Sequence, residues 1–181
     1  MHIDEIIRTR RTVHNFLPRP VPDALVHQAI ESARWAPNHK LTEPWEFLLI
    51  GKETAAAIAE RNAEMLRESK GEARAAHKLA RWLSMPGWML LTCRRVEDAF
   101  RQEEDYAACC CAAQNFMLSL WAQGVGTKWS TSPVTRDPEF FRLVGIDPDE
   151  RFSVGLFWYG FAAEECSSKR GALVDVVRRV P

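Results

Sequence analysis

The chain of 181 residues lacks an excess of charge of either sign, because 24 lysines and arginines are matched by 24 aspartates and glutamates. A net charge of zero removes any attraction of the whole protein to nucleic acid or to an anionic membrane surface. No apolar run approaches the ~20 residues needed to cross a bilayer. The N-terminal stretch MHIDEIIRTRR also lacks the apolar centre of an export signal. We therefore expect a cytoplasmic protein that binds neither nucleic acid nor membrane.

Signals for metal binding are also absent. The five cysteines form no Cys-x-x-Cys pair, and three of them, Cys109 to Cys111, are adjacent. Adjacent helical residues point about 100° apart, so these three thiols cannot converge on one metal ion. The five histidines show no metal-binding spacing and no His-Glu-x-x-His motif. We expect no metal site, and cysteines that act as small buried hydrophobic residues in a reducing compartment.

The common nucleotide-binding and nucleophile motifs are missing as well. No Gly-x-Gly-x-x-Gly follows a predicted strand, and Gly124-Val125-Gly126 closes a predicted helix instead of opening one. No Gly-x-x-x-x-Gly-Lys-[Ser/Thr] occurs, and Ser130 and Ser132 lack the context of a nucleophile elbow. These absences argue against a Rossmann domain, a P-loop nucleotide hydrolase and a serine hydrolase.

The hydrophobic pattern predicts a mixture of helices and strands. Long helical patterns cover roughly Glu53 to Trp82, with a break at Gly71, and Glu97 to Gln123. Between and around the helices lie four stretches of strand length: Trp45 to Ile50, which we expect to be a buried strand, Gly87 to Cys93, Thr127 to Thr131 and Arg151 to Phe161. The length fits one domain. We expect an α/β protein with a small sheet that helices cover on both faces.

Two stretches predict particular features of the helices. The stretch from Tyr106 to Trp121 is apolar on nearly every side, which is typical of a central helix. Asp137 followed by Pro138 is typical of a helix start, and Gly145 of its end.

The most basic segment of the chain is Arg8 to Phe16, RTRRTVHNF, and no acidic residue lies between Ile6 and Pro22. Arginines form charge-assisted, bidentate bonds to phosphate, and Thr9 or Thr12 can add a hydroxyl donor. Lys169 and Arg170, near the other end of the chain, can join the same anion if the fold brings them there. A solvated basic turn would show the same composition, so the pattern alone leaves both readings open.

A polar loop lies between a helix that begins at Asp23 and the first strand. Pro37 cannot continue the helix, and Asn38, His39 and Lys40 follow it. Polar side chains on a loop between rigid elements are well placed to meet a ligand. An ordinary helix-to-strand connection is the alternative.

Three stretches together resemble the nitroreductase family of FMN-dependent NAD(P)H oxidoreductases: RTRRTVHNF, APNHKLTEPWEF and AQGVGTKWSTS. They occur in the family's order and spacing over nearly the whole chain, and are most similar to its short, single-domain members. The resemblance implies one FMN-binding domain over residues 1–181, with a three-layer sandwich in which helices flank a small mixed or antiparallel sheet. It also implies a homodimer with FMN at the subunit interface.

The resemblance further implies which residues hold FMN. Arg10, Arg11 and Thr12 correspond to the family's phosphate grip, and Lys169 and Arg170 to a basic pair near the same phosphate. Trp129, Ser130 and Thr131 correspond to residues that line the flavin, while Trp35, Asn38 and His39 correspond to a loop that reaches it from the partner subunit. The family often has Lys or Arg where this chain has His14.

The function implied is that of an oxidoreductase in which NADH or NADPH passes hydride to flavin N5. An electron-poor acceptor such as a nitroaromatic or a quinone then takes the place of the nicotinamide. No catalytic acid or base is expected, because the flavin carries the chemistry. Trp35 and Trp129 are either walls of that pocket or core residues. The alternatives are a flavin-binding or storage protein without turnover, and a nucleic-acid-binding module that uses the RTRR segment.

Overall fold

The computed structural model describes residues 2–180 and contains a four-stranded sheet and six α-helices within them. The helices are α1 (Ile3–Thr9), α2 (Asp23–Arg34), α3 (Lys52–Lys70), α4 (Glu72–Leu83), α5 (Ala99–Ala122) and α6 (Pro138–Val144). The strands are β1 (Trp45–Leu49), β2 (Gly87–Arg94), β3 (Gly126–Ser130) and β4 (Arg151–Gly160). Short 3₁₀ turns, η1 (His39–Leu41), η2 (Pro133–Arg136) and η3 (Leu173–Asp175), complete the order.

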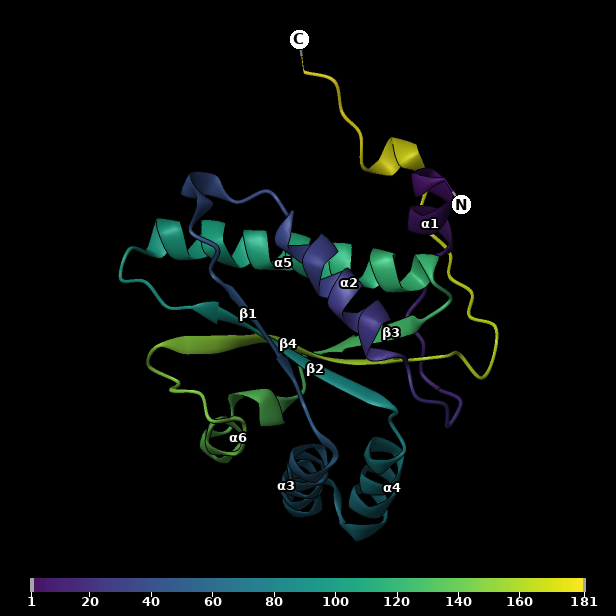
Figure 1. The fold of residues 1–181 in the computed structure, drawn as a ribbon, viewed down its shortest axis with the longest axis vertical. Coiled ribbons are helices and arrows are strands. Elements are labelled where there is room, and N and C mark those ends of the chain that lie inside the picture. The colour runs from purple at the N-terminus through teal and green to yellow at the C-terminus, as the bar shows by residue number, and fades with distance from the viewer. Residues whose placement is uncertain (1, 181) are drawn as a thin grey trace.

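The strands lie in the order β1-β2-β4-β3, and every neighbouring pair is antiparallel. Helices α2 and α5 cover one face of the sheet, and α3, α4 and α6 cover the other (Figure 1). Each face has its own apolar cluster, one containing Phe116 and Phe157 and the other containing Trp82 and Trp158. The expected three-layer α/β sandwich is confirmed, and its small sheet is antiparallel.

The strand at residues 45–49 differs from expectation, because β1 is an edge strand and not a buried one. Among the described residues its one pairing partner is β2, and Leu49 is 42% exposed. Its apolar run resembles that of a central strand, but local sequence does not determine strand order. The fully buried strand is β2, in which residues 87–93 are all buried between its two neighbours.

Helix α5 is apolar on most sides but only partly covered. Phe116 and Leu120 are fully buried against the sheet and α2, whereas Phe100 is 71% and Tyr106 42% exposed. The helix therefore keeps an apolar face that no described residue covers. Asp98 caps the start of the helix, and its side chain accepts a hydrogen bond from the amide of Arg101.

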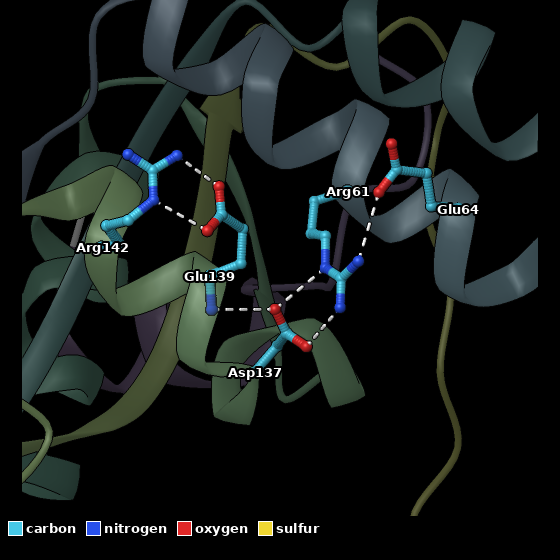
Figure 2. A network of polar contacts seen from close by, with 5 residues as sticks. All are labelled: Arg61, Glu64, Asp137, Glu139 and Arg142. Carbon is cyan, nitrogen blue, oxygen red and sulfur yellow. Dashed lines mark hydrogen bonds and ion pairs between the residues drawn. The ribbon is translucent and has the colours of Figure 1, made fainter.

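Asp137 and Gly145 delimit α6 as predicted. The Asp137 carboxylate accepts the amide of Glu139, and Gly145 adopts the left-handed conformation with φ of 68°. Figure 2 shows that the same carboxylate receives a bidentate pair from Arg61 of α3, at 3.0 and 2.8 Å. This contact ties α3 to the start of α6, directly after the loop that follows β3.

The C-terminal segment leaves the sandwich. After Cys166 every described residue is exposed, and the yellow ribbon in Figure 1 runs outward beyond the layer of α2 and α5. Leu173, Val174 and Val176 are each at least 75% exposed. The segment thus carries apolar side chains that nothing in the described chain covers.

Candidate functional site

The basic N-terminal segment is fixed against the edge strand β3. Thr12 forms a parallel bridge with Thr127, and the amide of Val13 donates to the carbonyl oxygen of Thr127 at 3.0 Å. Val13 is fully buried. A Cβ on Gly126 would collide with the Val13 side chain, so glycine is needed for this close approach. The segment that precedes Val13 is therefore held rigidly beside β3.

A cavity of about 410 Å³ lies at this segment and brings together residues that are distant in sequence. Its lining contains three arginines, one histidine, three hydroxyl side chains, one cysteine and no carboxylate: Arg10, Arg11, Thr12, His14, Cys166, Ser167, Ser168 and Arg170. The structure thus joins Arg170 to the predicted grip of Arg10 to Thr12. Lys169 is exposed and does not line the cavity. Arginine and hydroxyl donors without a competing acid suit a phosphate group.

Arg10 and Arg11 differ in their contacts and surroundings. Arg11 donates from Nη1 to the carbonyl oxygens of Arg8 and Arg10, at 2.6 and 2.8 Å, and its Nε is buried without a partner. Arg10 is half-buried, and burial together with the charges of Arg11 and Arg170 lowers its pKa. A bound dianion would relieve this crowding of like charges.

Two further cations, which the sequence did not indicate, adjoin this cavity. Arg81 of α4 donates to the carbonyl oxygen of His14 at 3.2 Å. Lys128 of β3 places its Nζ over the Trp158 ring, 5.3 Å from the centroid. Partial burial, Lys128 and Arg81 lower the pKa of His14, in that order of size. The basic surface thus continues from the N-terminal segment across β3 to α4.

The predicted polar loop is held by its own side chains and by α5. The Asn38 carbonyl Oδ1 accepts the amide of Glu43 at 2.7 Å, and its Nδ2 donates to the Thr42 hydroxyl at 3.0 Å. The Thr42 hydroxyl donates to Asp105 at 2.6 Å, and Asp105 is only 1% exposed. Asn38 therefore shapes the loop, while His39 stays exposed and pairs with Glu104 at 2.8 Å.

The same loop stores backbone strain. Lys40, Leu41 and Glu43 have φ values of 59°, 49° and 43°, in the left-handed region that residues other than glycine seldom adopt. Strained loop residues that a surrounding network holds in place cluster at functional sites. The loop lies at the α2–β1 connection and does not line the cavity around Arg10.

The two tryptophans of the predicted site lie in different environments. Trp35 is 81% exposed at the end of α2, and its Nε1 donates to Glu31 at 3.2 Å. Trp129 stacks on Phe157 at 5.2 Å between centroids and donates to the carbonyl oxygen of Val154. This placement favours the interpretation of Trp129 as a core residue. Trp35 is exposed and is available to contact a partner subunit.

Ser130 and Thr131, which were also predicted to line the flavin, lie at the end of β3. Ser130 is half-buried, whereas Thr131 is exposed and lines a separate cavity of about 660 Å³ beside Tyr106 and Phe152. The next residue, Ser132, lines yet another cavity next to α4. The strand end therefore lies between two hollows of the surface.

The cysteines follow the expectation only in part. Cys93 and Cys109 are buried, but Cys111 is exposed and Cys166 lines the cavity around Arg10. All five are free. Within residues 2–180 no group of three or more His, Cys, Asp or Glu side chains is arranged to hold a metal ion.

Comparison with known proteins places these features in a family. The model of the Nitroreductase family matches residues 7–161. The Bacillus subtilis (strain 168) protein "Putative NAD(P)H nitroreductase YfhC" is 32% identical over 154 residues, which are 82% of this chain and 79% of that protein. The chain belongs to the Nitroreductase family, whose members are oxidoreductases. Lys169 and Arg170 lie beyond the matched residues.

Solved structures share the fold over essentially the whole chain. A nitroreductase-like family protein from Bacillus cereus has a TM-score of 0.86 at 27% identity, covering 99% of this chain and 96% of that one. The FMN- and NADPH-dependent nitroreductase NfnB from sphigopyxis sp. strain HMH has a TM-score of 0.83 at 18% identity, with 100% of both chains covered. Among residues 2–180, no helix combines the length and the apolar character that a bilayer crossing requires.

Proposed function

We propose that this protein is an FMN-dependent NAD(P)H oxidoreductase that works as a homodimer. The observation that carries the proposal is the cavity in which Arg10, Arg11 and Arg170 meet hydroxyl side chains without a carboxylate. FMN ends in a phosphate dianion, which fits this donor set. Solved structures with the same fold support the same cofactor, because a putative nitroreductase from Desulfovibrio desulfuricans is a complex with FMN and NfnB is FMN- and NADPH-dependent.

The residues that line this cavity have different roles in holding the cofactor. Arg10, Thr12 and Arg170 bind the phosphate, and Arg11 keeps the segment in shape through its backbone contacts. FMN held by these residues would supply the redox chemistry, in which a nicotinamide would be the hydride donor and a nitroaromatic or a quinone the acceptor. Arg81 and Lys128 add positive charge beside His14, which favours uptake of negative charge at that place.

The homodimer is supported by apolar surface that the described residues leave uncovered. It extends over the outer face of α5 at Tyr106, the exposed Trp35 and the C-terminal valines. An obligate interface of about 2,000 Å² or more would cover such a surface. Because His39 and Trp35 are exposed and do not line the cavity around Arg10, their proposed contact with flavin is with that of the partner subunit.

Steady-state kinetics test the proposal. If donor and acceptor use one place in turn, double-reciprocal plots at several acceptor concentrations are parallel. Intersecting lines would indicate a ternary complex and a separate nicotinamide site. A protein that binds FMN but turns over no acceptor would be the storage protein instead. The half-burial of Arg10 and Arg11 around the cavity weighs against the nucleic-acid module, which would need these side chains on an open surface.

A further inference from the structure

A second basic cavity, of about 630 Å³, lies between α3 and α4 and reaches the loop after β3. Five basic side chains line it: Lys70, Arg74, His77, Lys78 and Arg81. The lining includes no aspartate or glutamate, and Met65, Leu66 and Val134 give it an apolar floor. The cavity is therefore suited to a molecule that has both a flat apolar part and negative charge.

The charges of this cavity are not neutralised by the protein. Within residues 2–180 none of the five basic side chains forms an ion pair, although other arginines of α3 and of α6, such as Arg67, do. Burial, and after it the charges of Arg81 and Arg74, lower the pKa of Lys78. An anion from outside the chain would relieve the repulsion.

One residue that lines this cavity has a buried amide donor without a partner. Asn62 of α3 is only 4% exposed and lines the cavity. Its Oδ1 accepts the hydroxyl of Ser132 at 3.1 Å, whereas its Nδ2 has no hydrogen-bond partner. Buried donors are seldom left unpaired in native proteins, so the described residues leave one polar group unsatisfied at a residue that lines this cavity.

The outer end of the cavity is separate from the phosphate site around Arg10. Arg81 lies at the inner end, where it contacts His14. Arg74 is seven residues earlier on α4, about 10 Å away along the helix axis. FMN has a single phosphate, and the cavity around Arg10 accounts for it. The cations at Lys70 and Arg74 are therefore left for a different anion.

We propose that Lys70 and Arg74 bind the 2′-phosphate of NADPH, so that the protein prefers NADPH to NADH as reductant. The inference rests on the proposed function, because the nicotinamide has to reach the flavin of the FMN held around Arg10 while the adenosine extends outward along α4. The 2′-phosphate is a dianion on the adenosine, at the far end from the nicotinamide, and NADH lacks it. The apolar floor at Met65 and Leu66 suits the adenine ring.

The test compares a double variant with a single-substitution control, both loaded with FMN. The combined Lys70→Gln and Arg74→Gln variant loses the two outer charges. The control, Lys52→Gln, makes the same kind of change on an exposed lysine at the opposite end of α3, about 27 Å from Lys70. We expect the double variant to raise KM for NADPH roughly tenfold or more at unchanged kcat. KM for NADH should change little, and the control should match the wild type with both.

A binding measurement that does not depend on turnover completes the test. Adenosine 2′,5′-bisphosphate and adenosine 5′-monophosphate are titrated into the FMN-loaded proteins by calorimetry. We expect the bisphosphate to bind more tightly to the wild type and the control, and the difference to vanish in the double variant.

The outcomes separate this inference from the proposed function. Equal use of NADPH and NADH by the wild type, or an equal loss with both in the double variant, overturns the 2′-phosphate site and leaves the enzyme in place. If neither NADPH nor NADH reduces bound FMN, the proposed function is overturned, and the calorimetric difference then decides the 2′-phosphate site by itself.

Discussion

Arg81 and His14 are 67 residues apart in the chain, and the Arg81 Nη2 donates to the His14 carbonyl oxygen at 3.2 Å. This contact joins α4 to the N-terminal basic segment and places a fixed positive charge beside the imidazole. The phosphate cavity around Arg10 and the basic cavity of α4 meet at this point, because His14 lines the first and Arg81 the second.

The pKa of His14 should rise when Arg81 is replaced by Gln, because a nearby cation disfavours the protonated imidazole. Lys128→Gln should act in the same direction, since Lys128 also lowers this pKa. An NMR titration of the His14 ring measures the change, and Lys52→Gln is the control with no contact to the ring. A His14 pKa that stays the same in both variants would show that the two cations do not act on it.

The ion pair between Arg61 and Asp137 should make stability depend on pH in acid. The guanidinium lowers the pKa of Asp137 below its ordinary value of about 3.9. Its stabilisation is therefore present above that unfolded-state value and lost as pH falls through the folded pKa. Asp137→Asn keeps a helix cap but loses the charge, so the wild type should be more stable at neutral pH and the difference should shrink below about pH 4. Urea unfolding at several pH values tests this, and a constant difference would contradict it.

Much of the scaffold is predictable from local signals. Gly71 separates α3 from α4 with φ of 82°, and Asp137 and Gly145 bound α6, because caps and left-handed positions have short-range chemical requirements. The edge position of β1 is not predictable in this way, since the pairing partner of Trp45 is Cys93, 48 residues further on. Strand order depends on such distant contacts.

The same distinction applies to the candidate site. Its residues that are adjacent in sequence are predictable, and those brought together by the fold are not. The RTRRT segment is visible because its arginines are adjacent in sequence. Arg81 and Lys128 join it only through the fold, and their sequence neighbours give no reason to group them. A weak signal exists on α4, where Arg74, Lys78 and Arg81 follow helical spacing and so share one face.

The cysteine triplet should affect stability unequally. Cys109 is fully buried, 4.0 Å from the carbonyl oxygen of Thr92, so the shorter bond of a serine hydroxyl would not reach that acceptor. Cys109→Ser should cost about 1–3 kcal/mol of unfolding free energy. Cys111→Ser changes an exposed side chain by the same atom and should cost little. Denaturant unfolding measures both, and loss of flavin-normalised turnover in a folded variant would indicate thiol chemistry.

Mixed dimers should reveal whether the two subunits share each flavin. One parent carries Arg10→Ala, and the other carries Trp35→Ala with His39→Ala, since Asn38 is needed for the shape of its own loop. Each parent dimer is impaired at both sites, whereas a mixed dimer collects all lesions in one site and leaves the other intact. Random exchange should restore about a quarter of wild-type activity. Mixed dimers that form, as mass spectrometry would show, but stay inactive would rule out the shared site.

The central claim, that the cavity around Arg10 binds the phosphate of FMN, is tested most directly by comparing FMN with riboflavin. The two differ only in the phosphate, and a charge-assisted bond of about 1.5–3 kcal/mol corresponds to roughly ten- to a hundredfold in affinity. Fluorescence titration of the flavin-free protein should show FMN binding more tightly by at least that factor, and Arg10→Ala should weaken FMN binding while leaving riboflavin binding unchanged. Equal affinity of the wild type for FMN and riboflavin would contradict the account.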